Sequence, residues 1–299
     1  MPREPVPLPE LGKIAKPKEL LRWAKLEGIR FLYGLLRPKP NLVAEMNWNN
    51  LIVLDACRFD AFAQVNDIPG TLTKIVSVAS CTWNWFPNNF SDRAMKDVVY
   101  ISANPYGSYY WLHKTLGHIP FYEVVEVWKD GWSEKLKTVH PSEVNKRTFE
   151  SLTANPHKRH IIHYMQPHHP FIGNVTLLDI DSGDWTVRWR DRIFDQVSEQ
   201  KELDAEKPNV FALLEQGVVN VKRVWRAYMS NLQLVMDYVK KLLPALNGRI
   251  CITSDHGELF GRFGVFYGHP AKTPLPELIE VPWLEVSKEE SKSPCSVRN

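Results

Sequence analysis

Apolar residues follow two spacings along this 299-residue chain, and each spacing predicts a different kind of element. Short continuous apolar runs are typical of strands buried on both faces of a parallel sheet. Apolar positions three or four residues apart are typical of helices that pack on such a sheet. The strand pattern occurs in five segments: 50–55, 74–78, 97–102, 159–164 and 248–254.

The helical pattern is clearest in residues 17–36 and 219–243. Alternation of strands and helices over this length predicts an α/β fold with a mostly parallel sheet. The polar and partly acidic residues 174–215 interrupt the alternation and are predicted to be an insertion or a lid. Residues 1–45 are predicted to form a basic amphipathic helix and a linker, and residues 291–299 a tail.

The helix predicted at 17–36 has two interpretations. Lys18, Arg22 and Lys25 form a charged stripe beside apolar surface. The helix either docks on the main domain through its apolar side or lies on an anionic membrane surface. The pattern is compatible with both. The apolar surface comes from Leu20, Leu21, Ala24, Phe31, Leu32 and Leu35.

Charge and cysteine content exclude several classes of protein. The net charge is +3; residues 1–39 hold nine Lys/Arg and four Asp/Glu, a surplus of +5, which leaves −2 for residues 40–299. A nearly neutral body gives no support for a nucleic-acid partner. The four cysteines show neither a CxxC pair nor a zinc spacing, which argues against a cysteine metal site and a disulfide framework.

The sequence shows no apolar run long enough to span a membrane, and its Pro-rich beginning lacks the apolar segment of a signal peptide. We therefore expect a cytoplasmic location. Peripheral membrane contact through residues 17–36 is compatible with that location. The oligomeric state is left open.

Two predicted strands end in acidic residues that are suited to binding a metal. Asp55 ends the first strand, and Asp255-His256 follows the last. The carboxyl ends of parallel strands meet at one edge of a sheet, and carboxylate with imidazole suits Zn²⁺ or Mn²⁺. The alternative for Asp55 is a helix cap or an ion pair with Arg58. Gly257 is expected to allow a sharp turn after the pair.

Three candidate nucleophiles lie in a row at Ser80, Cys81 and Thr82. A hydroxyl needs activation at neutral pH, which a bound cation and a helix N-terminus provide. The alternative is that these residues only cap a helix.

Four of the ten histidines lie beside strand ends or in loops rich in Gly and Pro: His163, His168, His169 and His269. Grouped beside a cation and a nucleophile, they are suited to a tetrahedral oxyanion or a second metal. Trp83, Trp85 and Tyr109 are candidates for stacking on a sugar, with core packing as the alternative. We expect structural roles for His113, His118, His140, His157 and His160.

The order of these motifs resembles the alkaline phosphatase superfamily, on its sulfatase and phosphoethanolamine-transferase side. That order is a strand-end acid, a nucleophile, a mid-chain His/Pro motif, a late Asp-His pair and a trailing His. Here it is represented by Asp55, Thr82, PHHPF at 167–171, SDHGE at 254–258 and YGHP at 267–270, with VPWL at 281–284 similar to the strand that follows.

The resemblance implies a three-layer sandwich, with helices flanking the central sheet, and a sulfatase-like catalytic domain over residues 46–290. It implies that Asp55, Thr82, Asp255 and His256 hold a divalent ion (Mn, Zn, Mg or Ca) and that Thr82 is the nucleophile. His168 and His269 would bind the transferred group, or a second ion in some members.

One departure concerns Cys81. A formylglycine sulfatase needs Cys-x-Pro-x-Arg, and Cys81 is followed by Thr-Trp-Asn-Trp. The leading hypothesis is therefore a metal-dependent hydrolase or transferase of small-molecule or glycan phosphate or sulfate esters, acting through Thr82. The alternative is a non-catalytic protein that binds a phosphorylated or sulfated ligand on the same scaffold. Ser80 or Cys81 in place of Thr82 also stays open.

Overall fold

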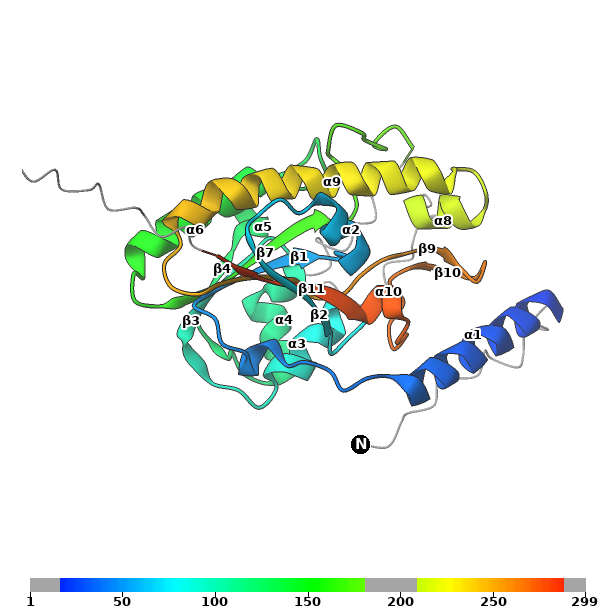
Figure 1. The fold of residues 1–299 in the computed structure, drawn as a ribbon, viewed down its shortest axis with the longest axis horizontal. Helices are drawn as coiled ribbons and strands as arrows, with labels where there is room; N and C mark the ends of the chain where they lie inside the picture. Colours follow the sequence, from blue (N-terminus) through cyan, green and yellow to red (C-terminus); the bar gives the residue numbers. More distant parts are fainter. Residues whose placement is uncertain (1–16, 181–208, 288–299) are drawn as a thin grey trace, which may run out of the picture.

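The computed structural model describes residues 17–180 and 209–287, and these build a sheet with helices on both faces (Figure 1). The sheet has seven strands, in the order β2-β11-β8-β1-β7-β3-β4. β8, β1, β7, β3 and β4 run parallel, whereas β11 is antiparallel to β8 and β2. The bounds are β1 Asn50–Asp55, β2 Gly70–Val76, β3 Met95–Ser102, β4 Phe121–Glu126, β7 Arg159–Pro167, β8 Ile250–Ser254 and β11 Glu280–Val286.

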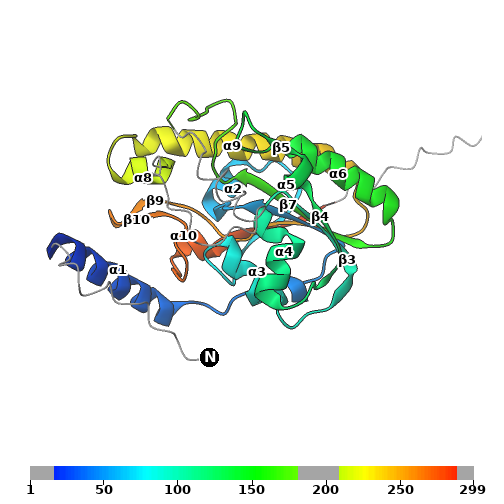
Figure 2. The same ribbon diagram turned by 180° about the vertical axis from the view of Figure 1, so that it is seen from behind.

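Helices cover the sheet on both sides (Figures 1 and 2). One layer contains α2 (Phe59–Val65), α5 (Val127–Asp130), α6 (Pro141–Ala154) and α9 (Val221–Leu242). The other contains α3 (Thr82–Phe90) and α4 (Tyr109–Leu116). The predicted three-layer α/β fold is confirmed.

The apolar run of β1 is explained by its place in the middle of the sheet. Successive side chains of a strand point to opposite faces. Ile52 and Leu54 accordingly join the core under α9, while Leu51 and Val53 join the core under α3. All six residues of β1 are buried, which a strand covered on both faces requires.

The remaining described elements are short, apart from α1. They are α1 (Pro17–Leu36), α8 (Val210–Glu215), α10 (Pro276–Ile279), β5 (Trp132–Ser133), β6 (Thr138–Val139), β9 (Leu259–Arg262), β10 (Phe266–Gly268) and the 3-10 helices Val43–Glu45, Pro105–Gly107 and Leu243–Ala245. None of the helices within 17–180 and 209–287 has both the length and the apolar content of a membrane span.

The predicted segments agree with these elements to different degrees. All five predicted strands occur, and the helix predicted at 17–36 is α1. The sequence pattern did not predict β4 or α6. Most of the predicted insertion at 174–215 and the tail at 291–299 lie outside the described residues. The described end of the insertion, α8, packs its buried Phe211 against Phe260 of β9, with ring centroids 5.9 Å apart.

Candidate active site

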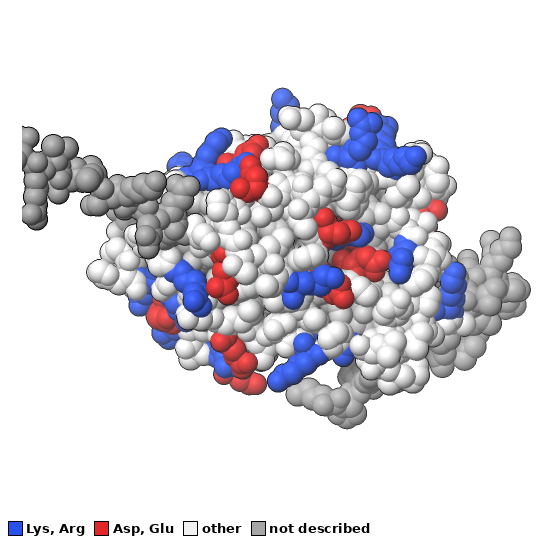
Figure 3. Space-filling view, viewed as in Figure 1, with Lys and Arg blue, Asp and Glu red and all other residues white. Residues whose placement is uncertain are grey.

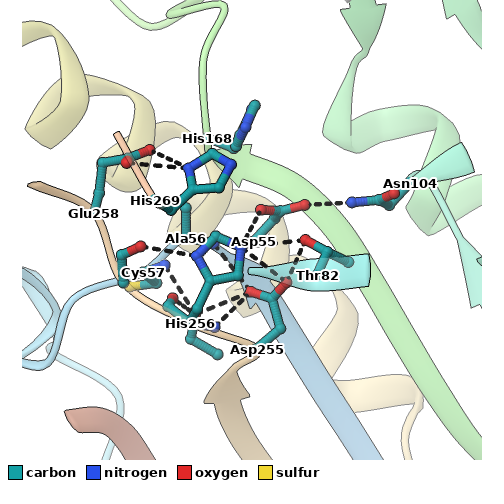
Figure 4. Close-up of polar contacts among 12 residues, drawn as sticks. Asp55, Ala56, Cys57, Thr82, Asn104, His168, Asp255, His256, Glu258 and His269 are labelled. Atoms are coloured by element: carbon teal, nitrogen blue, oxygen red, sulfur yellow. Dashed lines mark hydrogen bonds and ion pairs between the residues drawn. The ribbon is translucent and has the colours of Figure 1, made fainter. Parts of the chain in front are cut away.

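The candidate site lies where β1, β7 and β8 end at their carboxyl edges (Figure 4). β8 pairs with β1 in a register that places Ser254 beside Leu54, so Asp255 follows at the level of Asp55. Ala56 has a φ of 59°, an uncommon angle for a residue other than glycine, directly after Asp55. This turn takes the chain out of the sheet and leaves the Asp55 carboxylate at its edge.

Backbone amides fix the Asp255 carboxylate. Its Oδ1 accepts hydrogen bonds from the amides of Ala56 at 3.1 Å and His256 at 2.8 Å. Its Oδ2 is thereby left for the Thr82 hydroxyl, which donates to it at 2.7 Å.

Among the described residues, the Asp55 carboxylate has one hydrogen-bond donor, the amide Nδ2 of Asn104, at 2.5 Å from Oδ2. Arg58 pairs instead with Asp60 at 2.6 Å, so the alternative of an ion pair between Asp55 and Arg58 is wrong. Burial and then the neighbouring Asp255 raise the pKa of the Asp55 carboxyl well above its usual range.

Thr82 is the first residue of α3, and its side chain is directed at the acidic residues. The N-cap position of α3 belongs to Cys81, which makes no capping hydrogen bond through its side chain. The Thr82 hydroxyl lies 3.2 Å from His256 Nε2, in addition to its bond with Asp255. Because this hydroxyl bonds to the site rather than to the helix backbone, the capping alternative is wrong for Thr82.

His256 directs one ring nitrogen, Nε2, toward the carboxylates of Asp55 and Asp255. Its Nδ1 donates to the carbonyl of Gly257 at 2.8 Å, which leaves a lone pair on Nε2. Nε2 lies 3.7 Å from Asp55 Oδ1 and 3.4 Å from Asp255 Oδ2. Burial, followed by the nearby His269, lowers the pKa of His256 to about 3, so its imidazole is neutral and can act as a ligand.

Gly257 is needed for a reason that differs from the expected one. We expected glycine to be needed for a sharp turn, but within the described residues the φ of Gly257 is not among the positive values, so the backbone here does not require the conformational freedom of glycine. A Cβ at this position would lie 2.0 Å from the carbonyl oxygen of Glu277. The glycine therefore allows two backbone segments to pass in contact directly behind His256.

A second cluster consists of His168, Glu258 and His269. Both oxygens of the buried Glu258 carboxylate lie near His269 Nδ1, at 3.1 and 3.2 Å. His168 Nδ1 donates to the carbonyl of His169 at 2.5 Å. The rings of His168 and His269 have centroids 5.0 Å apart, which places two imidazoles side by side next to the first cluster.

The two histidines of this cluster have opposite pKa directions. Burial, then the neighbouring His169 and His269, lowers the pKa of His168 well below its usual value. Burial also disfavours the charged form of His269, but the Glu258 carboxylate outweighs it and the pKa of His269 is raised. A proton is therefore held more readily on His269 than on His168.

His163 lies on β7 between the two acids. Its Nε2 is 4.0 Å from Oδ2 of Asp55 and 4.0 Å from Oδ2 of Asp255. Its Nδ1 forms a hydrogen bond with the hydroxyl of Tyr100 at 2.5 Å. Burial lowers the pKa of His163 to about 4, so the ring is uncharged.

The chemistry of these groups fits a divalent cation. Ligand atoms of Asp55, His163 and Asp255 all lie within 4.8 Å of one another. Asp55 Oδ1 and His163 Nε2 are buried and have no hydrogen-bond partner among the residues that the structure describes. Two acids and neutral imidazoles are a donor set for Zn²⁺ or a similar ion, which would also balance the adjacent negative charges.

The clusters open into a pocket of about 190 Å³. Its lining includes Asp55, Thr82, His168 and His269, with the aromatic rings of Trp83 and Tyr106. Trp83 is 42% exposed. The predicted nucleophile and both predicted oxyanion-binding histidines thus line one pocket.

Other candidates lie elsewhere or are chemically unsuited. The ring of His169 packs against Phe211, with centroids 5.4 Å apart. The Ser80 hydroxyl donates to the carbonyl of Pro270 at 2.9 Å. Cys81 lines the pocket, but burial raises the pKa of its thiol to about 12, so it stays protonated. Trp85 is 1% exposed, and the proposal that it stacks on a sugar is wrong.

Sequence reasoning gave no role to Asn104 and Glu258. Asn104 comes two residues after the end of β3. Because the carboxyl ends of parallel strands meet at one edge of the sheet, the argument that identified Asp55 could also have identified Asn104. Glu258 was visible only as the last letter of the SDHGE motif. Its contact with His269 depends on the turn between β9 and β10, which the sequence did not reveal.

Comparisons with protein-family models and with curated proteins find no match. Solved structures do match. One is the integral membrane protein lipooligosaccharide phosphoethanolamine transferase A from Neisseria meningitidis, at 13% identity and a TM-score of 0.48, over 90% of this chain and 55% of that one. The present chain thus spans about half the length of that protein.

Two further matches represent both predicted branches. The C-terminal periplasmic domain of a phosphoethanolamine transferase from Campylobacter jejuni matches at 13% identity and a TM-score of 0.48, over 81% of this chain and 79% of that one. A 2-O GAG sulfatase matches at 12% identity and a TM-score of 0.47, over 84% of this chain and 65% of that one. These matches share 12–13% sequence identity with this chain, and the activities named in their descriptions are those of the matched proteins.

The same comparisons contradict the cytoplasmic location expected from the sequence. Three of the transferase matches are described as periplasmic domains or as an integral membrane protein. The expectation rested on the lack of a signal-like or membrane-spanning segment, and such a lack carries no information about the compartment.

Proposed function

We propose that this protein is a metal-dependent hydrolase or transferase of phosphate or sulfate esters, with Thr82 as its nucleophile. The observation that carries the proposal is the position of the Thr82 hydroxyl, 2.7 Å from Asp255 Oδ2 and 3.2 Å from His256 Nε2. A lone serine or threonine hydroxyl beside a carboxylate and a neutral imidazole, in the lining of a pocket, is the arrangement of an activated nucleophile.

Asp55, Thr82, Asp255 and His256 are the proposed ligands of one divalent ion. When bound, the ion lowers the pKa of the Thr82 hydroxyl and offsets negative charge on the ester. Asn104 and the amide of Ala56 hold the two carboxylates in place through hydrogen bonds of 2.5 and 3.1 Å. We assign the second cluster to the transferred group instead of a second ion.

Thr82 attacks the phosphorus or sulfur atom opposite the leaving oxygen. A bond forms to Thr82 Oγ1, the bond to the leaving oxygen breaks, and the hydroxyl proton leaves along the hydrogen bond to Asp255. Glu258 raises the pKa of His269, which favours a proton on this imidazole, and His269 delivers a proton to the leaving oxygen from Nε2. Neutral His168 binds the transferred group beside it.

The second half of the reaction releases Thr82. His269, having given up its proton, accepts one from a water molecule or an acceptor alcohol as that oxygen attacks the transferred group. Water gives hydrolysis and an alcohol gives transfer, and Thr82 regains its proton as its bond to the group breaks. The same imidazole thus acts as acid and then as base.

The size of the pocket limits what enters it. A volume of about 190 Å³ is below that of pockets that enclose a drug-sized ligand. The transferred group with a small substituent fits inside, and the rest of a larger ester lies at the rim beside Trp83. This supports small-molecule or glycan esters as the substrate class.

The test is turnover of aryl phosphate, phosphodiester and sulfate ester probes after treatment with EDTA and after return of Zn²⁺ or Mn²⁺. Thr82→Ala abolishes turnover and Thr82→Ser keeps part of it. Thr153→Ala, which removes an exposed threonine on α6, serves as the matched control and keeps full activity. Ligand binding that survives Thr82→Ala, with no turnover by any variant, identifies the binding-protein alternative instead.

A further inference from the structure

The exposed face of α1 is its more apolar face. Phe31, Leu32, Leu35 and Leu36, called here the outer face, are 59%, 52%, 63% and 68% exposed. Residues four apart lie on the same side of a helix, so the pairs 31/35 and 32/36 form one continuous strip. A surface helix normally presents polar residues to water, and a strip of four large apolar side chains marks a contact surface.

The opposite face of α1 is already docked on the core. Leu26, Ile29 and Tyr33 pack against the buried cluster around β9, β10 and α10. Arg30 Nε donates to Thr273 Oγ1 at 3.1 Å, and Lys25 Nζ donates to the carbonyl of Phe263 at 2.9 Å. Because these contacts fix the rotation of the helix, the outer face is not spare core surface that could turn inward.

α1 also lies at the edge of the molecule, beside the β9–β10 hairpin (Figures 1 and 2). Arg30 links it to Thr273, whose amide donates to Ser80 Oγ at 3.2 Å. Thr273 lies in the segment that follows His269, and Ser80 precedes Thr82 by two residues. A surface that binds the outer face is therefore held in a fixed relation to the pocket.

Charge indicates what binds there. Residues 1–39 carry a surplus of +5, and residues 40–299 sum to −2. On the body, Lys and Arg alternate with Asp and Glu without a large area of one sign on the face drawn in Figure 3. Lys39, which is exposed, follows the last residue of α1 by three positions. A second copy would bring two positive segments together, whereas an anionic bilayer attracts them.

We propose that the outer face of α1 binds an anionic lipid membrane and that α1 lies in its interface as a peripheral helix. Apolar side chains enter the boundary of the acyl chains while lysines stay among the headgroups. The proposal does not depend on catalysis, so it is tested separately from the proposed function.

The experiment is flotation of the full chain with two kinds of vesicle, phosphatidylcholine alone and phosphatidylcholine with phosphatidylglycerol. We expect binding to the second kind, weakened by added salt. Phe31→Gln/Leu35→Gln lowers the partition coefficient about tenfold or more, because two large apolar side chains no longer enter the bilayer. The control Phe149→Gln/Val218→Gln removes two other exposed apolar side chains, 42% and 68% exposed, and keeps binding.

Three outcomes of the flotation experiment would overturn the proposal. These are no binding to either vesicle, equal binding by the outer-face variant, and equal loss in the control variant. Sedimentation of the free protein adds one more: a dimer that the outer-face variant converts to monomer assigns the face to a second copy. Unchanged thermal unfolding shows that the variants are folded, as expected for substitutions of exposed side chains.

Discussion

The Asp55→Asn substitution separates stability from metal binding. The Asp55 carboxyl is 1% exposed and accepts one hydrogen bond, from Asn104, which an asparagine oxygen can also accept. The ligand atoms of Asp55 and Asp255 lie within 4.8 Å. Two unit charges at that distance repel by about 3.5 kcal/mol at an effective dielectric constant of roughly 20. Protonation of Asp55 relieves part of this, so we expect the metal-free variant to be about 1–2 kcal/mol more stable at neutral pH.

The pH dependence has a defined sign. Burial and Asp255 raise the pKa of Asp55 in the folded state, so the folded protein binds a proton there more tightly than the unfolded chain. The contribution of Asp55 to the stability of the metal-free protein therefore falls as pH rises from the unfolded pKa, near 4, toward the folded one. The difference between wild type and Asp55→Asn isolates this contribution, because both contain the same buried histidines.

The assay is thermal unfolding in EDTA and again with Zn²⁺. A gain of 1–2 kcal/mol corresponds to about 2–8 °C for a domain of this size. With Zn²⁺ at roughly 100 times its Kd, wild type gains about 2.7 kcal/mol and the variant much less, so the order reverses. Asp67→Asn, at an exposed ion pair with Lys240, is the control and changes little. Lower stability of Asp55→Asn in EDTA, or equal stabilisation by Zn²⁺, refutes the reasoning.

Three other substitutions test individual contacts. Asn231→Leu breaks bonds to backbone groups that hold the loop of His168, and urea unfolding should show a loss of about 2–4 kcal/mol together with a lower kcat/KM. Gly257→Ala places a Cβ 2.0 Å from a carbonyl oxygen, and we expect a loss of at least about 3 kcal/mol, or no soluble protein. Glu258→Gln lowers the pKa of His269, so the alkaline limb of the profile of kcat/KM against pH moves to lower pH; an unchanged limb removes His269 as the acid.

The central strands of the sheet were predictable from the sequence, because a strand that is buried on both faces consists of a continuous run of apolar residues. The run at 50–55 needs no information from elsewhere in the chain, and neither does Asp55 at its end. β4 was harder, because it lies at the edge of the sheet and Tyr122 is 53% exposed, which mixes polar and apolar positions. The antiparallel direction of β11 is a matter of topology that local periodicity does not encode.

The site was predictable as far as its residues end strands or lie in motifs. The pairing of β1 with β8 brings together Asp55, Asp255 and His256. This was predictable because the carboxyl ends of parallel strands meet at one edge of a sheet. The orientation of the side chains in the site was not predictable. The bonds that direct the Asp255 oxygens come from backbone amides, and the contact of Glu258 with His269 comes from a hairpin, so both depend on tertiary structure.

The central claim is that Thr82 forms a covalent bond to the transferred group. The most direct measurement is mass spectrometry of protein quenched during turnover of an ester probe, with the modified residue located by peptide fragmentation. The account predicts the mass of the transferred group on Thr82 in wild type and no adduct or turnover in Thr82→Ala. Sustained turnover by Thr82→Ala, or an adduct on another residue in wild type, would contradict it.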